Sequence, residues 1–158
     1  MIAFIRTATI EDIPQLLELE NKSFNDGDKF SRNQFYYAIQ KGESFLRVYE
    51  EEKGISGYVY ILVTGRIYSI AAYPNRGIGS LLLTRAEEFV KIILNKNTIK
   101  LEVRKDNTKA INFYIKRGYN PDKIKYHYYQ DGMDALVMKK ELNSYATRRL
   151  AATSDIIR

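Results

Sequence analysis

The hydrophobic pattern in the middle of this chain changes twice in succession from that of a strand to that of a helix. An apolar run at 67–72 is followed by apolar residues at helical spacing over 82–93. An alternating run at 99–103 is followed by a second helical pattern over 110–115. The two periods, 2.0 and 3.6 residues, distinguish strands from helices. Because each helix must bury its apolar side, these residues predict an α/β fold in which helices cover a sheet.

Hairpin patterns on both sides of this middle section make the predicted sheet mixed rather than wholly parallel. The expected order is β-α-α-β-β-β-α-β-α-β-β. Strands are expected at 2–6, 45–49, 57–63, 67–72, 99–103, about 123–129 and 134–140. The first two helices are expected over 10–22 and between Ser31 and Gly42, with Thr9 and Ser31 as their caps.

Length and composition narrow the classes of protein further. The 158 residues predict about one domain, over 1–142, while 143–158 lack a clear period and form an appended tail. With no cysteine and one histidine, His127, a cysteine nucleophile is excluded, and neither a histidine triad nor a metal site is expected. No apolar run approaches the roughly 20 residues of a membrane helix. No membrane partner is therefore expected, and the predicted location is the cytoplasm.

The net charge of +6 favours anionic partners. No run of five or six like charges marks a basic arm, however, so nucleic acid is not the expected partner. The sequence leaves the oligomeric state open.

Gly77-Ile78-Gly79 stands between the strand ending near Tyr73 and the helix that follows. A phosphate can approach backbone N–H groups closely where no Cβ intervenes, and a helix N-terminus adds about half a positive charge. The alternative is a strand-to-helix turn that needs a positive φ. The spacing matches neither a P-loop nor a complete dinucleotide-binding fingerprint.

The segment Pro74–Leu82 resembles the acetyl-CoA motif of the GNAT superfamily, Gln/Arg-x-x-Gly-x-Gly/Ala, whose backbone amides hold the coenzyme pyrophosphate. The resemblance implies a mostly antiparallel sheet with helices on both faces, and acetyl-CoA as acetyl donor. The segment departs from the motif at Pro74, and its loop is about two residues shorter than the usual form. Arg76 is therefore expected to supply the missing positive charge. The implied coenzyme contacts are Ile70, Ala71, Ala72, Arg76, Gly77, Ile78, Gly79 and Ser80.

A second segment, 101–119, closely resembles the Leu-Glu-Val-Arg-x-x-Asn-x-x-Ala-Ile-x-x-Tyr-x-x-x-Gly-Phe/Tyr segment of ribosomal-protein-alanine N-acetyltransferases. The resemblance implies Glu102 as general base, Asn107 as a coenzyme contact, and Tyr114 as coenzyme contact and general acid. Asn107 and Tyr114 lie two helical turns apart and share a face. Each has a structural alternative: an ion pair for Glu102, a helix cap for Asn107, and a core position for Tyr114.

The paired tyrosines before Gln130, and the residues around Phe24, resemble the two walls of the peptide groove in protein N-terminal acetyltransferases. The implied substrate contacts are Phe24, Tyr128 and Tyr129. The tyrosines have two alternatives, which are cross-strand aromatic pairs in a hairpin and stacking on single-stranded nucleic acid.

The expected function is transfer of an acetyl group from acetyl-CoA to a primary amine by direct attack. The acceptor implied by the resemblance is a protein or peptide N-terminal α-amine, with a ribosomal protein as one candidate. Two alternatives stay open: a small-molecule amine such as a polyamine or aminoglycoside, or a catalytically inactive module that binds coenzyme or RNA.

Overall fold

A computed structural model describes residues 3–42 and 45–142 of the chain. Seven strands form one sheet in the order β1-β2-β3-β4-β5-β7-β6. The strands are β1 (Phe4–Thr7), β2 (Phe45–Glu51), β3 (Gly54–Ile61), β4 (Arg66–Ala72), β5 (Thr98–Arg104), β6 (Asn120–Lys125) and β7 (Ala135–Glu141). The α-helices are α1 (Ile13–Ser23), α2 (Arg32–Lys41), α3 (Ile78–Glu88) and α4 (Thr108–Ile115). The predicted order of strands and helices is confirmed, as is the mixed, mostly antiparallel sheet.

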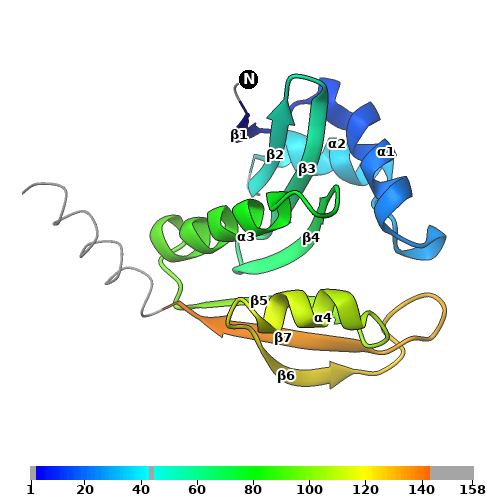
Figure 1. Cartoon of the computed structure of the whole chain (residues 1–158), viewed down its shortest axis with the longest axis vertical. Coiled ribbons are helices and arrows are strands. Elements are labelled where there is room, and N and C mark those ends of the chain that lie inside the picture. The colour runs from blue at the N-terminus through cyan, green and yellow to red at the C-terminus, as the bar shows by residue number, and fades with distance from the viewer. Residues whose placement is uncertain (1–2, 43–44, 143–158) are drawn as a thin grey trace, which may run out of the picture.

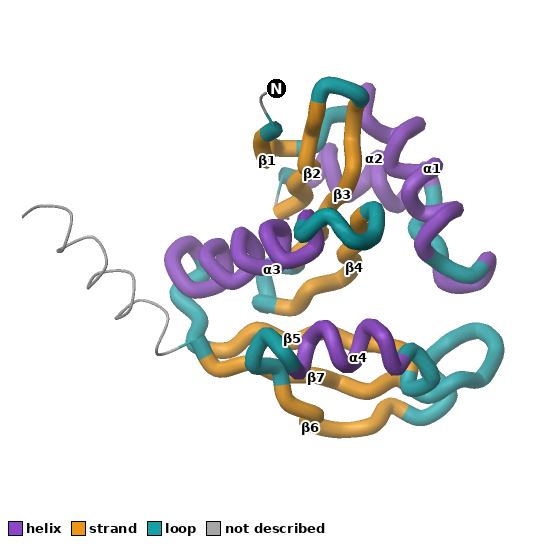
Figure 2. Tube along the Cα trace, viewed as in Figure 1, coloured by secondary structure: helices purple, strands orange, loops and turns teal. Residues whose placement is uncertain are grey.

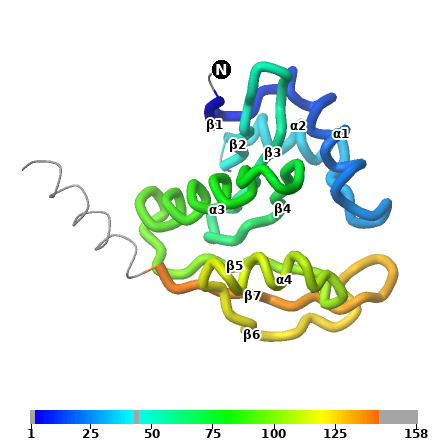
Figure 3. Tube along the Cα trace, viewed as in Figure 1, coloured from blue at the N-terminus to red at the C-terminus, as the bar shows by residue number. Residues whose placement is uncertain are grey.

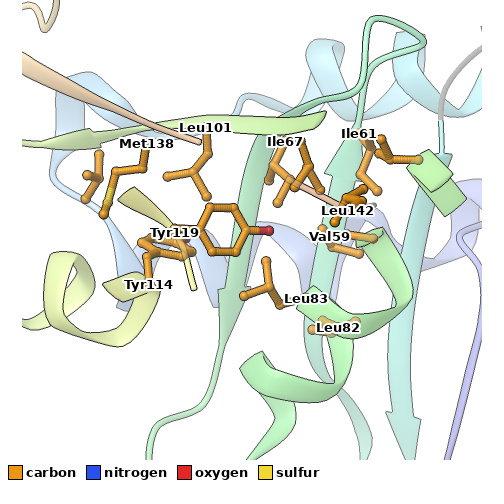
Figure 4. Packing of buried hydrophobic residues seen from close by; sticks show 14 of the residues in the cluster. Val59, Ile61, Ile67, Leu82, Leu83, Leu101, Tyr114, Tyr119, Met138 and Leu142 are labelled. Atoms are coloured by element: carbon orange, nitrogen blue, oxygen red, sulfur yellow. The ribbon is translucent and has the colours of Figure 1, made fainter. Parts of the chain in front are cut away.

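Helices cover both faces of the sheet. The helices α3 and α4 lie on one side of it, while α1 and α2 cover the other side of the first half (Figure 1, Figure 2). Tyr58 and Val59, neighbours on β3, lie in opposite cores, as the two-residue period of a strand requires. Figure 4 shows the α3–α4 side, where Leu82 and Leu83 pack near Tyr119.

Two helix termini follow the expected signals. Ser31 Oγ accepts a hydrogen bond from Gln34 N at 3.3 Å, and Ser31 N donates to Gln34 Oε1 at 2.8 Å, which forms a capping box. The helix ends at Gly42 with φ +62°. Helix α3 continues into a π-helical turn over Phe89–Ile93, so the apolar pattern expected through Ile93 is helical.

The strands β4 and β5 diverge along their length, and this divergence positions the site. They are parallel and pair only at Arg66–Lys100 and Ile67–Leu101. Beyond Ile67 the gap between the two strands widens (Figure 1). Within the described part of the chain, the edge of β4 that faces β5 therefore has no strand partner over 69–72.

The bounds expected for the sixth strand, about 123–129, are wrong at both ends, because β6 runs over Asn120–Lys125. Strand β6 pairs with β7 from Asn120–Lys139 to Lys125–Ala135, and the chain leaves the sheet at Tyr126. His127 has φ +50°, and its N–H donates to Asp134 Oδ1 at 3.0 Å, which closes residues 126–134 into a loop. The residues at the start of β6 are exposed, so they lack the apolar alternation by which a strand is predicted.

The last described residue, Leu142, is buried, and its N–H donates to Asn97 O at 2.7 Å. Figure 3 shows the end of β7 beside the start of β5. The predicted tail, 143–158, lies outside the described residues. Among the helices of the described ranges, none has the length and apolar character needed to span a membrane.

Candidate active site

Two cavities meet where β4 and β5 diverge. The first, here called the loop cavity, measures 560 Å³ and lies between the loop after α1, the β4 and β5 strands, and the loop over 126–134. The second, here called the helix cavity, measures 460 Å³ and lies between the end of β4 and the α3 and α4 helices. Both are lined by the same seven residues: Ile70, Ala71, Ala72, Pro74, Asn107, Ala110 and Tyr114.

The first turn of α3 forms one wall of the helix cavity. Gly77 precedes the helix with φ +72°, a conformation that glycine adopts without strain. The N–H groups of Ile78, Gly79 and Ser80 belong to the first turn, where no intrahelical acceptor exists. These groups and the helix dipole give this wall the character of an anion site. All four residues line the cavity, as expected for the predicted pyrophosphate turn.

Arg117 adds a full positive charge to the same cavity, and sequence reasoning missed it. Its Nε donates to Ser80 Oγ at 2.9 Å, and its Nη1 donates to Phe113 O at 2.9 Å. The guanidinium also lies 3.6 Å from the centroid of the Phe113 ring. A signal was available, because Arg117 follows Tyr114 by three residues and so falls on the same side of the helix end.

Tyr114 lines both cavities and is 8% exposed. Among the described residues, none forms a hydrogen bond to its hydroxyl. Burial raises the pKa of Tyr114, and the charge of Arg117 partly offsets the rise. The hydroxyl therefore stays protonated at neutral pH and is free to donate a hydrogen bond at the junction of the cavities.

Glu102 lines the loop cavity and is held by two cations. Its Oε2 lies 2.5 Å from Arg66 Nε, and its Oε1 lies 2.5 Å from Lys125 Nζ. Only 7% of the side chain is exposed. The ion pairs considered as a structural alternative are thus present, and the same carboxylate also faces the cavity. The two roles are compatible, because the ion pairs leave Glu102 on the lining of the cavity.

Two loops distant in sequence close over the loop cavity through Arg104. Its Nη1 lies 2.7 Å from Asp28 Oδ2, and its Nη2 lies 2.5 Å from Asp131 Oδ2. Its guanidinium lies 4.8 Å from the centroid of the Tyr129 ring. The loop after α1 and the loop over 126–134 are therefore held together by one side chain.

The three residues expected to contact substrate, Phe24, Tyr128 and Tyr129, all line this cavity. The two tyrosine rings contact each other edge to face at 5.1 Å. They belong to a loop rather than to a strand, so the arrangement differs from cross-strand aromatic pairing.

The sequence profile of the Acetyltransferase (GNAT) family matches residues 13–119, which is most of the described chain. The chain belongs to the acetyltransferase (GNAT) family. It is therefore an acetyltransferase of the GNAT type, with the two cavities at the divergence of β4 and β5.

Two relatives of this GNAT chain are named N-alpha-acetyltransferases. An N-alpha-acetyltransferase of Sulfurisphaera tokodaii is 28% identical over 156 residues, covering 87% of this chain and 92% of the relative. An N-alpha-acetyltransferase of Sulfolobus acidocaldarius is 32% identical over 154 residues, covering 87% and 92%. The structure of the ribosomal-protein-S18-alanine N-acetyltransferase from Escherichia coli superposes with a TM-score of 0.75 at 23% identity, covering 89% of this chain and 94% of that chain.

Asn107 caps a helix of this GNAT chain and also lines both cavities, while its contact with coenzyme stays a prediction. Its Oδ1 accepts a hydrogen bond from Ala110 N at 3.1 Å and so caps α4. Its side-chain amide has no partner among the described residues, and Asn107 lines both cavities. The cap thus leaves the N–H₂ group available.

Arg76 is the one predicted site residue that lines neither of the two cavities. Its Nη2 lies 2.5 Å from Glu51 Oε1, and about half of the side chain is exposed. Arg117, not Arg76, is the arginine that lines the helix cavity of this acetyltransferase. In residues 3–42 and 45–142, no group of three or more histidine and carboxylate side chains could hold a metal ion.

Proposed function

We propose that this acetyltransferase transfers the acetyl group of acetyl-CoA to the α-amine of a protein N-terminus. One observation carries the proposal: Tyr114 and Asn107 line two cavities at once, so a donor in one can meet an acceptor in the other. The charges of the two cavities then indicate which one would bind the donor and which the acceptor.

The helix cavity suits the donor. Acetyl-CoA carries phosphates, and this cavity offers the N–H groups of the α3 turn together with the cations of Arg117 and Lys109. When bound, acetyl-CoA supplies the thioester that is cleaved. The backbone of Ile70–Ala72, free of a strand partner on the β5 side, would donate a hydrogen bond to the carbonyl oxygen as negative charge develops there.

Glu102 and Tyr114 would carry the protons. The amine attacks as the neutral species, so Glu102 takes a proton from the ammonium, directly or through a water molecule. Tyr114 donates its hydroxyl proton to the departing thiolate. The C–N bond forms and the C–S bond breaks. The nitrogen loses a second proton as it becomes the amide, and this proton restores the Tyr114 hydroxyl through water, while the proton on Glu102 passes to solvent.

The loop cavity suits a peptide better than a polyamine. Its charged lining consists of three cations, Lys22, Arg66 and Arg104, and two carboxylates, Asp28 and Glu102. Both carboxylates already pair with cations of the chain. A polycation would therefore meet no surplus of negative charge, whereas one α-amine beside Glu102 needs only one base.

The test is to incubate the protein with acetyl-CoA and a panel of N-terminal peptides, spermidine, an aminoglycoside and a peptide with a blocked N-terminus and an internal lysine. Mass spectrometry then locates the acetyl group. We expect acetylation of peptide α-amines, and none on the blocked peptide. Acetylation confined to the small amines or to lysine would contradict the acceptor, and the absence of any acetylation would contradict the catalytic proposal.

A further inference from the structure

A third cavity adjoins the loop cavity and is strongly basic. It measures 520 Å³ and shares Arg66 and Glu102 with the loop cavity. Its charged lining consists of five cations and one carboxylate: Arg66, Lys96, Lys100, Lys123, Lys125 and Glu102. We call these six residues and the surface between them the basic groove.

The positive charge of the basic groove is not neutralised within the described chain. Its one carboxylate, Glu102, is shared between Arg66 and Lys125. The nearest carboxylate to Lys100 is Asp122, whose Oδ2 lies 3.9 Å away. Neither Lys96 nor Lys123 forms an ion pair with any described residue. The groove therefore offers several cations to an external anion.

Protection of a sheet edge explains only some of these cations. Lysines on an edge strand such as β6 discourage edge-to-edge pairing, which accounts for Lys123 and Lys125 alone. Arg66 lies on β4, Lys100 on β5, and Lys96 just before β5. The strands β4 and β5 are inner strands of the sheet, so edge protection does not explain these three cations, which all line the same groove.

We propose that the basic groove binds acidic side chains of the acceptor polypeptide, a few residues after its N-terminal amine. This inference rests on the proposed function. The groove follows β5 from Glu102 back to Thr98, a distance of four strand residues or roughly 13 Å. An extended peptide rises by the same amount per residue, so, with its α-amine beside Glu102, the preferred acidic positions are about the second to the fifth of the acceptor.

An acidic peptide fits the groove better than single-stranded RNA does. Proteins that bind single-stranded nucleic acid combine cations with aromatic rings on which bases stack. None of the described residues lining the groove is aromatic. Its recognition elements are charge and an exposed sheet surface, which suit carboxylates on an extended chain.

The experiment uses three peptides with the same first residue and with acidic, neutral or basic residues at positions two to five. We expect a KM about tenfold lower for the acidic than for the neutral peptide, with equal kcat, because several exposed ion pairs contribute together. The preference should shrink as NaCl rises from about 0.05 M to about 0.5 M. Equal KM values for the acidic and neutral peptides at low salt would overturn the proposal.

The double variant Lys96→Gln/Lys123→Gln locates the effect. It should reduce the preference to less than about threefold while leaving the neutral peptide unchanged. The control Lys53→Gln/Lys116→Gln removes the same charge from exposed positions outside the groove and should keep the preference.

A preference for the acidic peptide that survives in the Lys96→Gln/Lys123→Gln variant would overturn the proposal. So would binding of a fluorescent single-stranded RNA that the first variant loses, if the peptides show no preference. Absence of acetylation with all three peptides would contradict the proposed function as well.

Discussion

The side chains of Tyr114 and Tyr119 lie close together (Figure 4), and their rings contact each other edge to face with centroids 5.6 Å apart. Their surroundings differ, because Tyr119 bonds a buried carboxylate and Tyr114 lines the two cavities. The Tyr119 hydroxyl donates to Glu87 Oε1 at 3.1 Å, and Lys140 Nζ lies 2.9 Å from the same carboxylate. The Tyr114 hydroxyl has no such partner among the described residues, and Tyr114 lines both cavities. The Tyr119 hydroxyl therefore stabilises the core, whereas the Tyr114 hydroxyl is available to donate a proton.

This pair separates catalysis from packing. Tyr114→Phe should lower kcat about 10²-fold, the usual worth of a general acid, while the melting temperature stays near that of the parent. Tyr119→Phe should retain kcat but lose about 1–2 kcal/mol of stability, because Glu87 loses one donor. Steady-state kinetics and thermal melts of both variants check this. Full kcat in Tyr114→Phe would remove the general acid from the mechanism.

Two substitutions separate the capping role of Asn107 from the role of its free side-chain amide. Asn107→Ser keeps a capping oxygen but removes the amide, whereas Asn107→Ala removes both and should cost about 1 kcal/mol of stability. We expect Asn107→Ser to raise the KM for acetyl-CoA severalfold with little loss of stability. If this variant keeps the parent KM, the residue serves as a cap alone.

The two arginines near the glycine turn should differ in their effect on the donor. Arg117→Ala should raise the KM for acetyl-CoA about tenfold, as loss of one charge-assisted contact would. Arg76→Ala should change that KM less, because Arg76 pairs with Glu51 away from the helix cavity. Kinetics at saturating peptide measure both values. The reverse order would show that Arg76 turns toward the phosphates when they bind.

Glu20 should make stability depend on pH. This carboxylate is buried, and burial raises its pKa above the ordinary value of 4.5. Because the folded state favours the protonated form, the contribution of Glu20 is fully present below that ordinary value. It is lost as pH rises through the higher pKa of the folded state.

Glu20→Gln cannot titrate, so its melting temperature relative to the parent should increase as pH rises above about 4.5. The amide can still bond Phe30 N and the Tyr58 hydroxyl, the two donors of the parent carboxylate. Thermal melts across pH, with the exposed Glu52→Gln as control, measure the difference. A difference that stays constant with pH would contradict the expected effect of burial.

The sequence supported the parts of this molecule that depend on local pattern. The alternation at 99–103 and the cap at Asn107 each act within a few residues, and both elements are where they were expected. The motif carried by Glu102 and Tyr114 also depends on a continuous segment. Both residues line the loop cavity, and their catalytic roles stay a prediction.

What could not be predicted depends on contacts between distant segments. Arg104 bridges Asp28 and Asp131, which lie 76 and 27 residues away, and no local pattern marks such a pairing. The same holds for the ion pair between Glu102 and Lys125. The limits of β6 were missed for another reason, since its exposed first residues carry no apolar period.

The pairing of Glu102 leaves a choice between an ion-paired position and a base, and Lys125→Gln helps to resolve it. That variant keeps the carboxylate and removes one of its two cations. It should retain most of its kcat with a neutral peptide, whereas Glu102→Gln should lose about 10²–10³-fold at pH 7. Similar losses in both variants would assign Glu102 to packing.

The most direct test of the account is the pH dependence of kcat for the parent and Glu102→Gln on one peptide whose α-amine is the only acceptor. With a free α-amine pKa of about 7.7–8.0, a growing share of the acceptor is neutral as pH rises. We predict that the deficit of Glu102→Gln is large at pH 7 and narrows above about pH 8.5, with unchanged melting temperature. Full kcat of this variant at pH 7 would contradict the account.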